Sequence, residues 1–464
     1  MKIIIFLIFF GLAGALFAQT AALPETGQNR DQVDIESILN EAVEMLSRRE
    51  FSSALGLFDS LPEEEKEKTE IRIMRASILN SAGRIAEARQ IANDIVNADR
   101  NNTEALMVLA DSAAIEGRER DRRTFLERVI AANPRHARAL IDLGNLAINA
   151  RNLRSAANYF DRALAAEPDN GEALVSRAVV HRYNRENRNA ERLLNHAIEL
   201  YPNWAGPLQE RARLYKGANY LQDALSDLDA ARALEPDNYW VSVDRGLVLM
   251  DMNRRQEALE DFKRAIEIDS EIFIAYVYSA GLKEEFGDYS GAEQDYIKMG
   301  RIRPEYYFAF EGLGVLRMRR KEWAGARDAF LEAYRHAPRE YTYALLATVC
   351  WMRAGRQTDP RQFLAQVLRT VPRDSLEFTV LRVFHDLNHD SDAAVRINAE
   401  QNNALKSRMA FYLASYYDIR GNQTLANRYY LLVQELDVAA TIEWRLNEWV
   451  LSERGLGIRM QNER

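Results

Sequence analysis

Prolines and small residues recur along this chain at one constant spacing, which equals the distance in sequence from Pro134 to Pro168. This spacing is called the repeat interval below. Every gap in the proline series is the repeat interval or twice that: Pro134, Pro168, Pro202, Pro236, Pro304, Pro338 and Pro372. Only Ser270 breaks the proline series, and a small residue stands twelve positions before most of these positions: Ala156, Ala190, Ala224, Ala258, Ala292 and Ala326. A second small series precedes the first by another twelve: Ala110, Gly144, Ala178, Ala212, Gly246, Ala280 and Gly314. Such a fixed period predicts a stack of structurally equivalent units.

Each period is predicted to be a pair of helices. Two columns of small residues indicate two helices whose backbones come close together, and a bulky column provides the side chains that fill the hollow. The bulky residues are Phe160, Leu194, Leu228, Phe262, Tyr296 and Phe330. Proline then ends the second helix, because it has no amide hydrogen to donate. Asn170 and Asn238, which follow two of these prolines, are expected to cap the next helix.

These columns resemble the tetratricopeptide repeat. Its signature is found in Leu140, Leu143, Gly144, Ala156, Phe160 and Pro168, and again in Phe310, Leu313, Gly314, Ala326, Phe330 and Pro338. The resemblance implies an all-α fold, a right-handed α-solenoid of about eleven helical hairpins with a C-terminal capping helix. We assign ten repeats to residues 35–372 and one more to 404–437. Residues 373–403 are interpreted as a degenerate helical segment, and 438–464 as the capping helix and tail.

The N-terminal segment that precedes Ile35 predicts export. Residues 1–18 combine Lys2, an apolar run and small residues ending at Ala18, which is typical of a cleaved signal peptide. The alternative is a retained anchor, although this segment is shorter than the roughly 20 residues of a membrane span. Residues 19–34 are polar and are interpreted as a flexible leader. We therefore expect a location in the periplasm or cell envelope, with no stable membrane insertion after cleavage.

Composition and charge narrow the classes of partner. The chain is 47% hydrophobic and has only 22 glycines and 11 prolines, as expected for a mostly helical protein with a large core. Its formal charge is −8, or −9 without Lys2, so nucleic acid is not an expected partner. Cys350 is the only cysteine, which leaves none for a lipid at the cleavage site or for an internal disulfide.

Few residues suggest catalysis. Cys350 falls in an apolar column of the repeat and is expected to be a buried, inert thiol. His385 and His389 could share a metal if one helix ran through both, but the polar residues between them favour a helix end. The basic run Arg317, Arg319, Arg320 and Lys321 is interpreted as a solvated face, with an anionic partner as the alternative. We predict no enzymatic activity, no cofactor and no metal.

A strip on the first helices of successive units is the candidate binding site. In the tetratricopeptide family this strip lines a concave groove, and here it is apolar where solvent would favour polar residues. The candidate partner-binding residues are Trp240, Val243, Leu247, Met250, Ile274, Val277, Phe308, Val315 and Met318. The alternative is that they pack between neighbouring hairpins, as is also expected for the aromatic column Tyr239, Phe273, Tyr307 and Tyr341. Preceding units place Gln209, Arg213 and Lys216 on the same strip.

Three functions follow from this pattern. The first is an exported scaffold or adaptor that holds a protein or peptide partner in the groove. Residues 408–451 resemble the last repeat and cap of bacterial envelope adaptors that recruit peptidoglycan hydrolases. The second is a structural envelope component that associates with itself and has no dedicated ligand groove. The third, a metal-dependent hydrolase centred on His385 and His389, lacks further ligands in the sequence. The partner's identity and the oligomeric state do not follow from the sequence.

Overall fold

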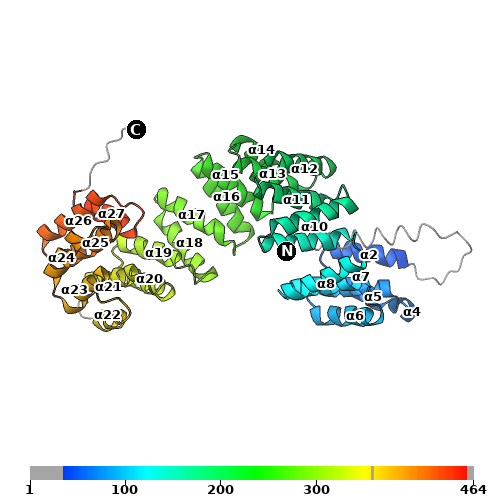
Figure 1. Ribbon diagram of the computed structural model, residues 1–464, viewed down its shortest axis with the longest axis horizontal. Coiled ribbons are helices and arrows are strands. Elements are labelled where there is room, and N and C mark those ends of the chain that lie inside the picture. The colour runs from blue at the N-terminus through cyan, green and yellow to red at the C-terminus, as the bar shows by residue number, and fades with distance from the viewer. Residues whose placement is uncertain (1–34, 357–359, 457–464) are drawn as a thin grey trace, which may run out of the picture. The chain divides into compact units, whose positions relative to one another are not determined.

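The computed structural model describes residues 35–356 and 360–456, which fold into a succession of helical hairpins without a β-strand (Figure 1). The predicted signal peptide (1–18), the leader (19–34) and the last part of the tail (457–464) lie outside the described residues. The chain divides into two compact units, unit 1 (Met1–Glu235) and unit 2 (Pro236–Arg464). Within the described ranges no helix is long and apolar enough to cross a membrane.

Unit 1 contains helices that pair in order along the chain, with one short helix, α4, between two pairs. They are α2 (Ile35–Ser47), α3 (Phe51–Asp59), α4 (Glu63–Lys66), α5 (Thr69–Ser81), α6 (Ile85–Ala98), α7 (Thr103–Ile115), α8 (Glu119–Ala132), α9 (Ala137–Asn149), α10 (Leu153–Ala166), α11 (Gly171–Tyr183), α12 (Asn187–Leu200), α13 (Ala205–Gly217) and α14 (Leu221–Leu234). Each pair contacts the next one along the stack, as expected for a solenoid.

Unit 2 continues the same plan and ends in a single helix. Its helices are α15 (Tyr239–Asp251), α16 (Arg255–Ile268), α17 (Phe273–Glu285), α18 (Tyr289–Ile302), α19 (Phe308–Arg319), α20 (Trp323–His336), α21 (Tyr341–Arg353), α22 (Arg361–Val367), α23 (Leu376–Asp386), α24 (Asp390–Ala399), α25 (Asn403–Ile419), α26 (Gln423–Leu436) and α27 (Ile442–Glu453). The last helix packs on α25 and α26.

The predicted packing of large side chains into small positions is confirmed. A Cβ added at Gly246 of α15 would lie 2.8 Å from Phe262 Cε1 of α16, and Gly144 and Gly314 are filled in the same way by Phe160 and Phe330. The alanines of the second small column are fully buried. The two helices of a hairpin therefore touch where the sequence places its smallest residues.

The turn inside each hairpin uses a left-handed residue. Positive φ recurs at the repeat interval at Gly83, Gly117, Arg151, Arg185, Asn219, Asn253, Gly287, Lys321 and Gly355. Glycine and asparagine adopt this conformation at little cost, whereas arginine and lysine are strained there. The turn between hairpins uses side-chain caps: Asn170 Oδ1 accepts a hydrogen bond from Ala173 N at 3.0 Å, and Asn238 Oδ1 accepts one from Trp240 N at 3.1 Å. Both predicted caps are confirmed.

A column of buried aspartates on the second helices was not anticipated from the sequence. Asp227, Asp261 and Asp295 are separated by the repeat interval and are at most 6% exposed. Each pairs with a cation of the preceding helix: Asp227 with Arg211 at 2.7 Å, Asp261 with Arg245 at 2.6 Å, and Asp295 with Lys283 at 2.7 Å. The constant spacing of these carboxylates was the available signal.

Candidate functional site

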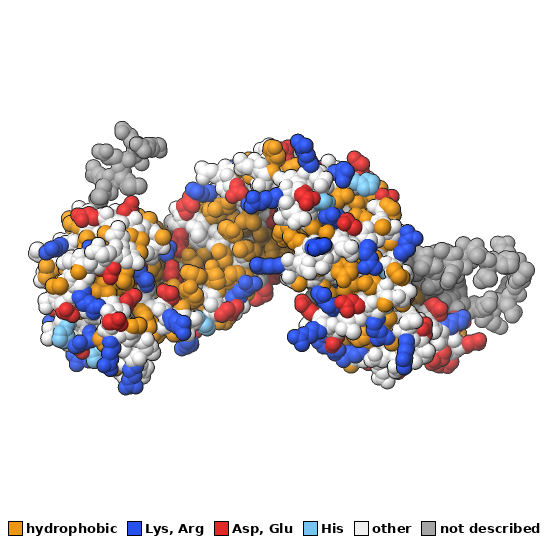
Figure 2. All heavy atoms as spheres, viewed as in Figure 1, with side chains coloured by type: hydrophobic (Ala, Val, Ile, Leu, Met, Phe, Trp, Pro, Cys, Tyr) orange, Lys and Arg blue, Asp and Glu red, His pale blue; other side chains and the backbone are white. Residues whose placement is uncertain are grey.

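The candidate strip is exposed over only part of its length. Trp240 on α15 and Phe308 on α19 are 44% and 47% exposed. The other accessible members are partly buried: Leu247, Met250, Ile274 and Val277. Figure 2 shows hydrophobic side chains gathered over the part of unit 2 that contains α15–α18. These six residues from α15, α17 and α19 are called the open strip below.

Three of the candidate residues belong to the core, which corrects the sequence-based expectation. Val243 is 2% exposed, and on its helix face it is flanked by the longer Trp240 and Leu247. Val315 and Met318 are 4% and 3% exposed. They belong to a large hydrophobic cluster that also contains residues of α20 to α27, so this end of the strip is part of the core of unit 2.

Helix α27 forms ion pairs with α19 and the residue that follows it, one near each of its ends. Arg445 near its start pairs with Glu311 of α19 at 2.8 Å, and Glu453 at its end pairs with Lys321, just after α19, at 2.9 Å. The two helices therefore run alongside each other in the same direction. On the following first helix, α21, the corresponding residues Thr342, Leu345, Val349 and Met352 are also buried.

A buried carboxylate anchors the start of α27. Glu443 is 1% exposed, and its Oε1 accepts hydrogen bonds from Thr342 Oγ1 at 2.8 Å and from the Tyr412 hydroxyl at 2.7 Å. The guanidinium of Arg408 lies 3.6 Å from the same oxygen. Burial and the neighbouring Glu443 charge raise the pKa of Tyr412 well above its usual value, so its hydroxyl remains a donor.

Two glutamates give the strip a negative charge. Glu284 Oε1 of α17 accepts a hydrogen bond from the Tyr296 hydroxyl at 2.6 Å, and Glu311 Oε2 of α19 accepts one from the Tyr343 hydroxyl at 2.6 Å. Burial, followed by the adjacent carboxylate, raises the pKa of both tyrosines. The Arg445 guanidinium pairs with Glu311 and also acts on Tyr296, so these charges form one local group.

Aromatic rings border the open strip at the beginnings of the first helices. Tyr307 and Phe308 have ring centroids 4.3 Å apart, and Tyr239 and Trp240 are 5.3 Å apart. Phe273 meets Tyr306 edge to face at 5.0 Å. Within these pairs the predicted column residues Tyr239, Phe273 and Tyr307 are partly buried, whereas Trp240 and Phe308 project into solvent. The column therefore supports the exposed rings.

The other candidate residues have structural partners. Cys350 is fully buried, as predicted, and burial raises the pKa of its thiol. Helix α23 ends at Asp386, so His385 and His389 do not share a helical face, and His385 Nδ1 lies 2.6 Å from Asp386 Oδ1. Over the described part of the chain, no group of three or more potential ligands could hold a metal.

Three residues of the basic run at the end of α19 form ion pairs within the protein. Arg317 Nε lies 2.8 Å from Glu293 Oε1, Arg320 pairs with the same glutamate, and Lys321 pairs with Glu453. Burial opposes the ionisation of Glu293, but the two arginines hold its pKa below the usual value. The run therefore stabilises the turn that follows α19 and the position of α27.

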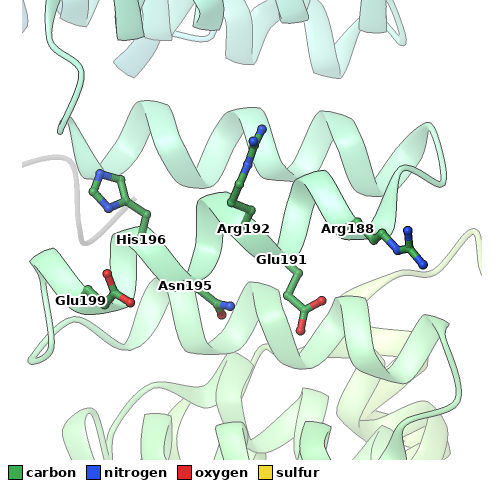
Figure 3. Close-up of a pocket in the computed structure, with 6 residues that line it drawn as sticks. All are labelled: Arg188, Glu191, Arg192, Asn195, His196 and Glu199. Atoms are coloured by element: carbon green, nitrogen blue, oxygen red, sulfur yellow. The ribbon is translucent and has the colours of Figure 1, made fainter.

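The first-helix strip of unit 1 is polar. Asp111 of α7 accepts a hydrogen bond from Arg138 of α9 at 2.8 Å, and Arg122 bonds Asp142 at 2.7 Å. Burial raises the pKa of Asp111 to about 6 against the opposing charge of Arg138. A surface depression elsewhere in unit 1 is lined by six residues of α12 alone (Figure 3): Arg188, Glu191, Arg192, Asn195, His196 and Glu199. Neither region combines exposed aromatic residues with apolar surface.

Family models confirm the nature of the repeats. Two tetratricopeptide-repeat models match residues 141–205 and 242–272, one in each unit. Together with the helical hairpins and their regularly spaced columns, these matches show that both units of the chain contain tetratricopeptide repeats. Proteins that contain this repeat are typically interaction scaffolds that bind proteins or peptides and have no catalytic centre. No curated protein sequence matches the chain.

Solved structures of similar fold cover parts of this chain. A tetratricopeptide repeat protein from Parabacteroides merdae is 19% identical and covers 54% of this chain and 98% of its own, with a TM-score of 0.43. PilF of Pseudomonas aeruginosa is 21% identical over 44% of this chain and 92% of its own, with a TM-score of 0.39. YrrB, described as having an unusual peptide-binding site, is 18% identical over 40% of this chain and 96% of its own, with a TM-score of 0.30.

Proposed function

We propose that this protein is an exported scaffold or adaptor that holds a protein or peptide partner on the open strip of unit 2. The observation that carries the proposal is the exposure of Trp240 and Phe308, at 44% and 47%, on a surface that also presents Leu247, Met250, Ile274 and Val277. Large apolar side chains grouped in this way are typical of interaction sites rather than of an ordinary solvated face.

The chemistry of the strip suits recognition. Tryptophan and phenylalanine bury a large area on binding and lose little side-chain entropy, and they often dominate the energy of an interface. Their neighbours Tyr239 and Tyr307 hold the rings in place at 5.3 Å and 4.3 Å. We assign no catalytic step to this protein. The composition of residues 1–18 supports a location in the periplasm or cell envelope.

The second candidate function is a structural envelope component that associates with itself. The same exposed rings would then contact another copy of the chain. Affinity capture of the protein from its native envelope, followed by mass spectrometry, separates the two functions: an adaptor enriches one foreign partner, and a self-associating component enriches its own chain.

The test of the site is a double variant, Trp240→Ser with Phe308→Ser. We expect it to weaken partner capture at least about tenfold, equivalent to roughly 1.4 kcal/mol. Because both rings are exposed, the melting temperature followed by circular dichroism should change little. Phe286→Ser is the matched control, since Phe286 is also 44% exposed but lies at the end of α17, outside the open strip. Unchanged capture by a well-folded double variant would exclude this site.

A further inference from the structure

We infer that the partner segment held by the open strip is an amphipathic helix with a basic residue, which binds beside α27 and pairs with Glu284. This inference rests on the proposed function, because it names the chemistry of the partner at that site. Three features of unit 2 support it: the contact of α27 with α19, the charge around Glu284, and the placement of apolar residues on α15 and α17.

The contact between α27 and α19 shows which kind of helix binds beside the first-helix strip of this protein. Helix α27 is amphipathic: Leu446 and Leu451 are at most 1% exposed, whereas Arg445 has a half-exposed side chain. It packs on α25 and α26, and its Arg445 pairs with Glu311 of α19. An amphipathic helix thus already places a basic residue on one glutamate of the strip.

The open strip lies next to the contact between α27 and α19, and beside it is a second glutamate in addition to Glu311. Glu284 lies on α17, the first helix that precedes α19 in the stack, and is partly exposed. The local group contains two carboxylates, Glu284 and Glu311, and one guanidinium, Arg445, which pairs with Glu311 at 2.8 Å. The carboxylate of Glu284, in contrast, accepts its hydrogen bond from the uncharged Tyr296 hydroxyl. Because attraction is stronger in partly desolvated sites, this charge favours a cationic side chain of a partner.

The apolar residues lie at a distance that a helix can bridge. Val277 precedes Glu284 by seven residues on α17, which corresponds to about 10 Å along a helix axis. A partner helix with a basic residue about two turns from an apolar one can reach both positions. Leu247 and Met250 on α15 provide the next apolar contact, and the exposed rings of Trp240 and Phe308 lie at the other end of their helices.

The test uses a labelled peptide with the sequence of residues 441–455, a helix whose chemistry the strip already accepts, and the full chain after removal of residues 1–18. Fluorescence anisotropy compares this peptide with one that carries Arg445→Glu. We expect the wild-type protein to bind the arginine peptide at least about tenfold more tightly. The protein variant Glu284→Lys should reverse this preference. Glu284→Gln, which keeps an acceptor for the Tyr296 hydroxyl, should weaken binding of the arginine peptide at least about threefold.

Matched controls separate charge from folding. Glu260→Gln changes an exposed carboxylate of α16, whose side chain is 61% exposed, and should leave peptide binding unchanged. Circular dichroism melts of the Glu284 variants show whether they fold. Sedimentation of the protein without peptide reports self-association through the same surface.

Three results would overturn the inference. The first is equal binding of both peptides by wild type and Glu284→Lys, or no binding of either. The second is a loss of binding with Glu311→Gln but not with Glu284→Lys, which would mean that the peptide replaces α27. The third is self-association that Glu284→Lys abolishes, which would make a second copy the occupant. If Trp240→Ser with Phe308→Ser loses the native partner while Glu284→Lys retains it, the proposed function stands and only this inference fails.

Discussion

Arg445 of α27 donates a hydrogen bond from Nη2 to Glu311 Oε1 of α19 at 2.8 Å, although the two residues are 134 positions apart. This contact returns the end of the chain to a helix that precedes it by several hairpins. Val315 and Met318 of α19 and the equivalent residues of α21 are buried, whereas Phe308 at the start of α19 and the open-strip residues of α15 and α17 remain accessible.

The Arg445–Glu311 ion pair and the buried Glu443 of α27 should contribute very differently to stability. Arg445→Ala removes a pair whose arginine is half exposed, and we expect a loss of at most about 1 kcal/mol. Glu443→Ala removes a buried carboxylate that holds Thr342, Tyr412 and Arg408, and should cost about 3 kcal/mol or more. Urea unfolding of unit 2 measures both losses. Similar values for the two variants would contradict the assignment of Glu443 as the anchor.

Adding one methyl group should have opposite effects at two helical glycines. Gly246→Ala places a Cβ 2.8 Å from Phe262 Cε1, and we expect the overpacking to destabilise the protein by about 1–3 kcal/mol. Gly281→Ala meets no atom within 4 Å and should stabilise α17 by about 0.5–1 kcal/mol. Thermal melts compare the two variants directly. A stabilising Gly246→Ala would show that the helices of this hairpin are further apart than described.

The left-handed turn positions predict a stabilising substitution. Arg151 is exposed and has a φ of 57°, a conformation that costs a non-glycine residue about 1–2 kcal/mol. Arg151→Gly relieves this strain but raises the entropy of the unfolded chain, so we expect a net gain of up to about 1 kcal/mol. The reverse change at an equivalent turn, Gly117→Ala, should destabilise, because Gly117 has a φ of 69°. Melting temperatures that move in the same direction for both variants would exclude this account.

Acid should loosen the contacts of Asp418 with α21 and the end of α27. Burial opposes ionisation of Asp418, but hydrogen bonds from Arg454 and Arg353 hold its pKa below the usual value. A lowered folded-state pKa gives stability that is present above the unfolded value of about 3.9 and is lost as pH falls through the folded value. The stability difference between wild type and Asp418→Asn should therefore be constant near neutral pH and shrink below about pH 4. Melts recorded from pH 7 to pH 2.5 check this, and a difference independent of pH would be inconsistent with it.

The hairpins were predictable because the interactions that define them are local. Ala156, Phe160 and Pro168 lie within one repeat, and the repetition of their spacing made the pattern clear. The left-handed turns at Gly83, Gly117 and Gly287 carried the same periodic signal and could also have been identified. Turns at arginine or lysine could not, because those residues seldom adopt positive φ.

The candidate strip was predictable only in part. Position along the helix placed Trp240, Ile274 and Phe308 on one face, and that periodicity is a property of the backbone. Whether a residue on this face is exposed depends on what covers it, and Val315 and Met318 are buried in a cluster that extends to α27, which is distant from both in the chain. No local pattern encodes such a contact.

The sequence by itself determined the repeat, the all-helical architecture and the buried position of Cys350, because each depends on neighbours within one or two hairpins. Only the tertiary structure decided which part of the first-helix strip is available to a partner. The end of the chain folds back to pair Arg445 with Glu311 of α19, and Val315 and Met318 of the same helix are buried in the cluster that α20 to α27 form, while Trp240 and Phe308 remain exposed. The physical reason is that burial of apolar surface has no direction along the chain, so a distant helix satisfies it as well as a neighbouring one.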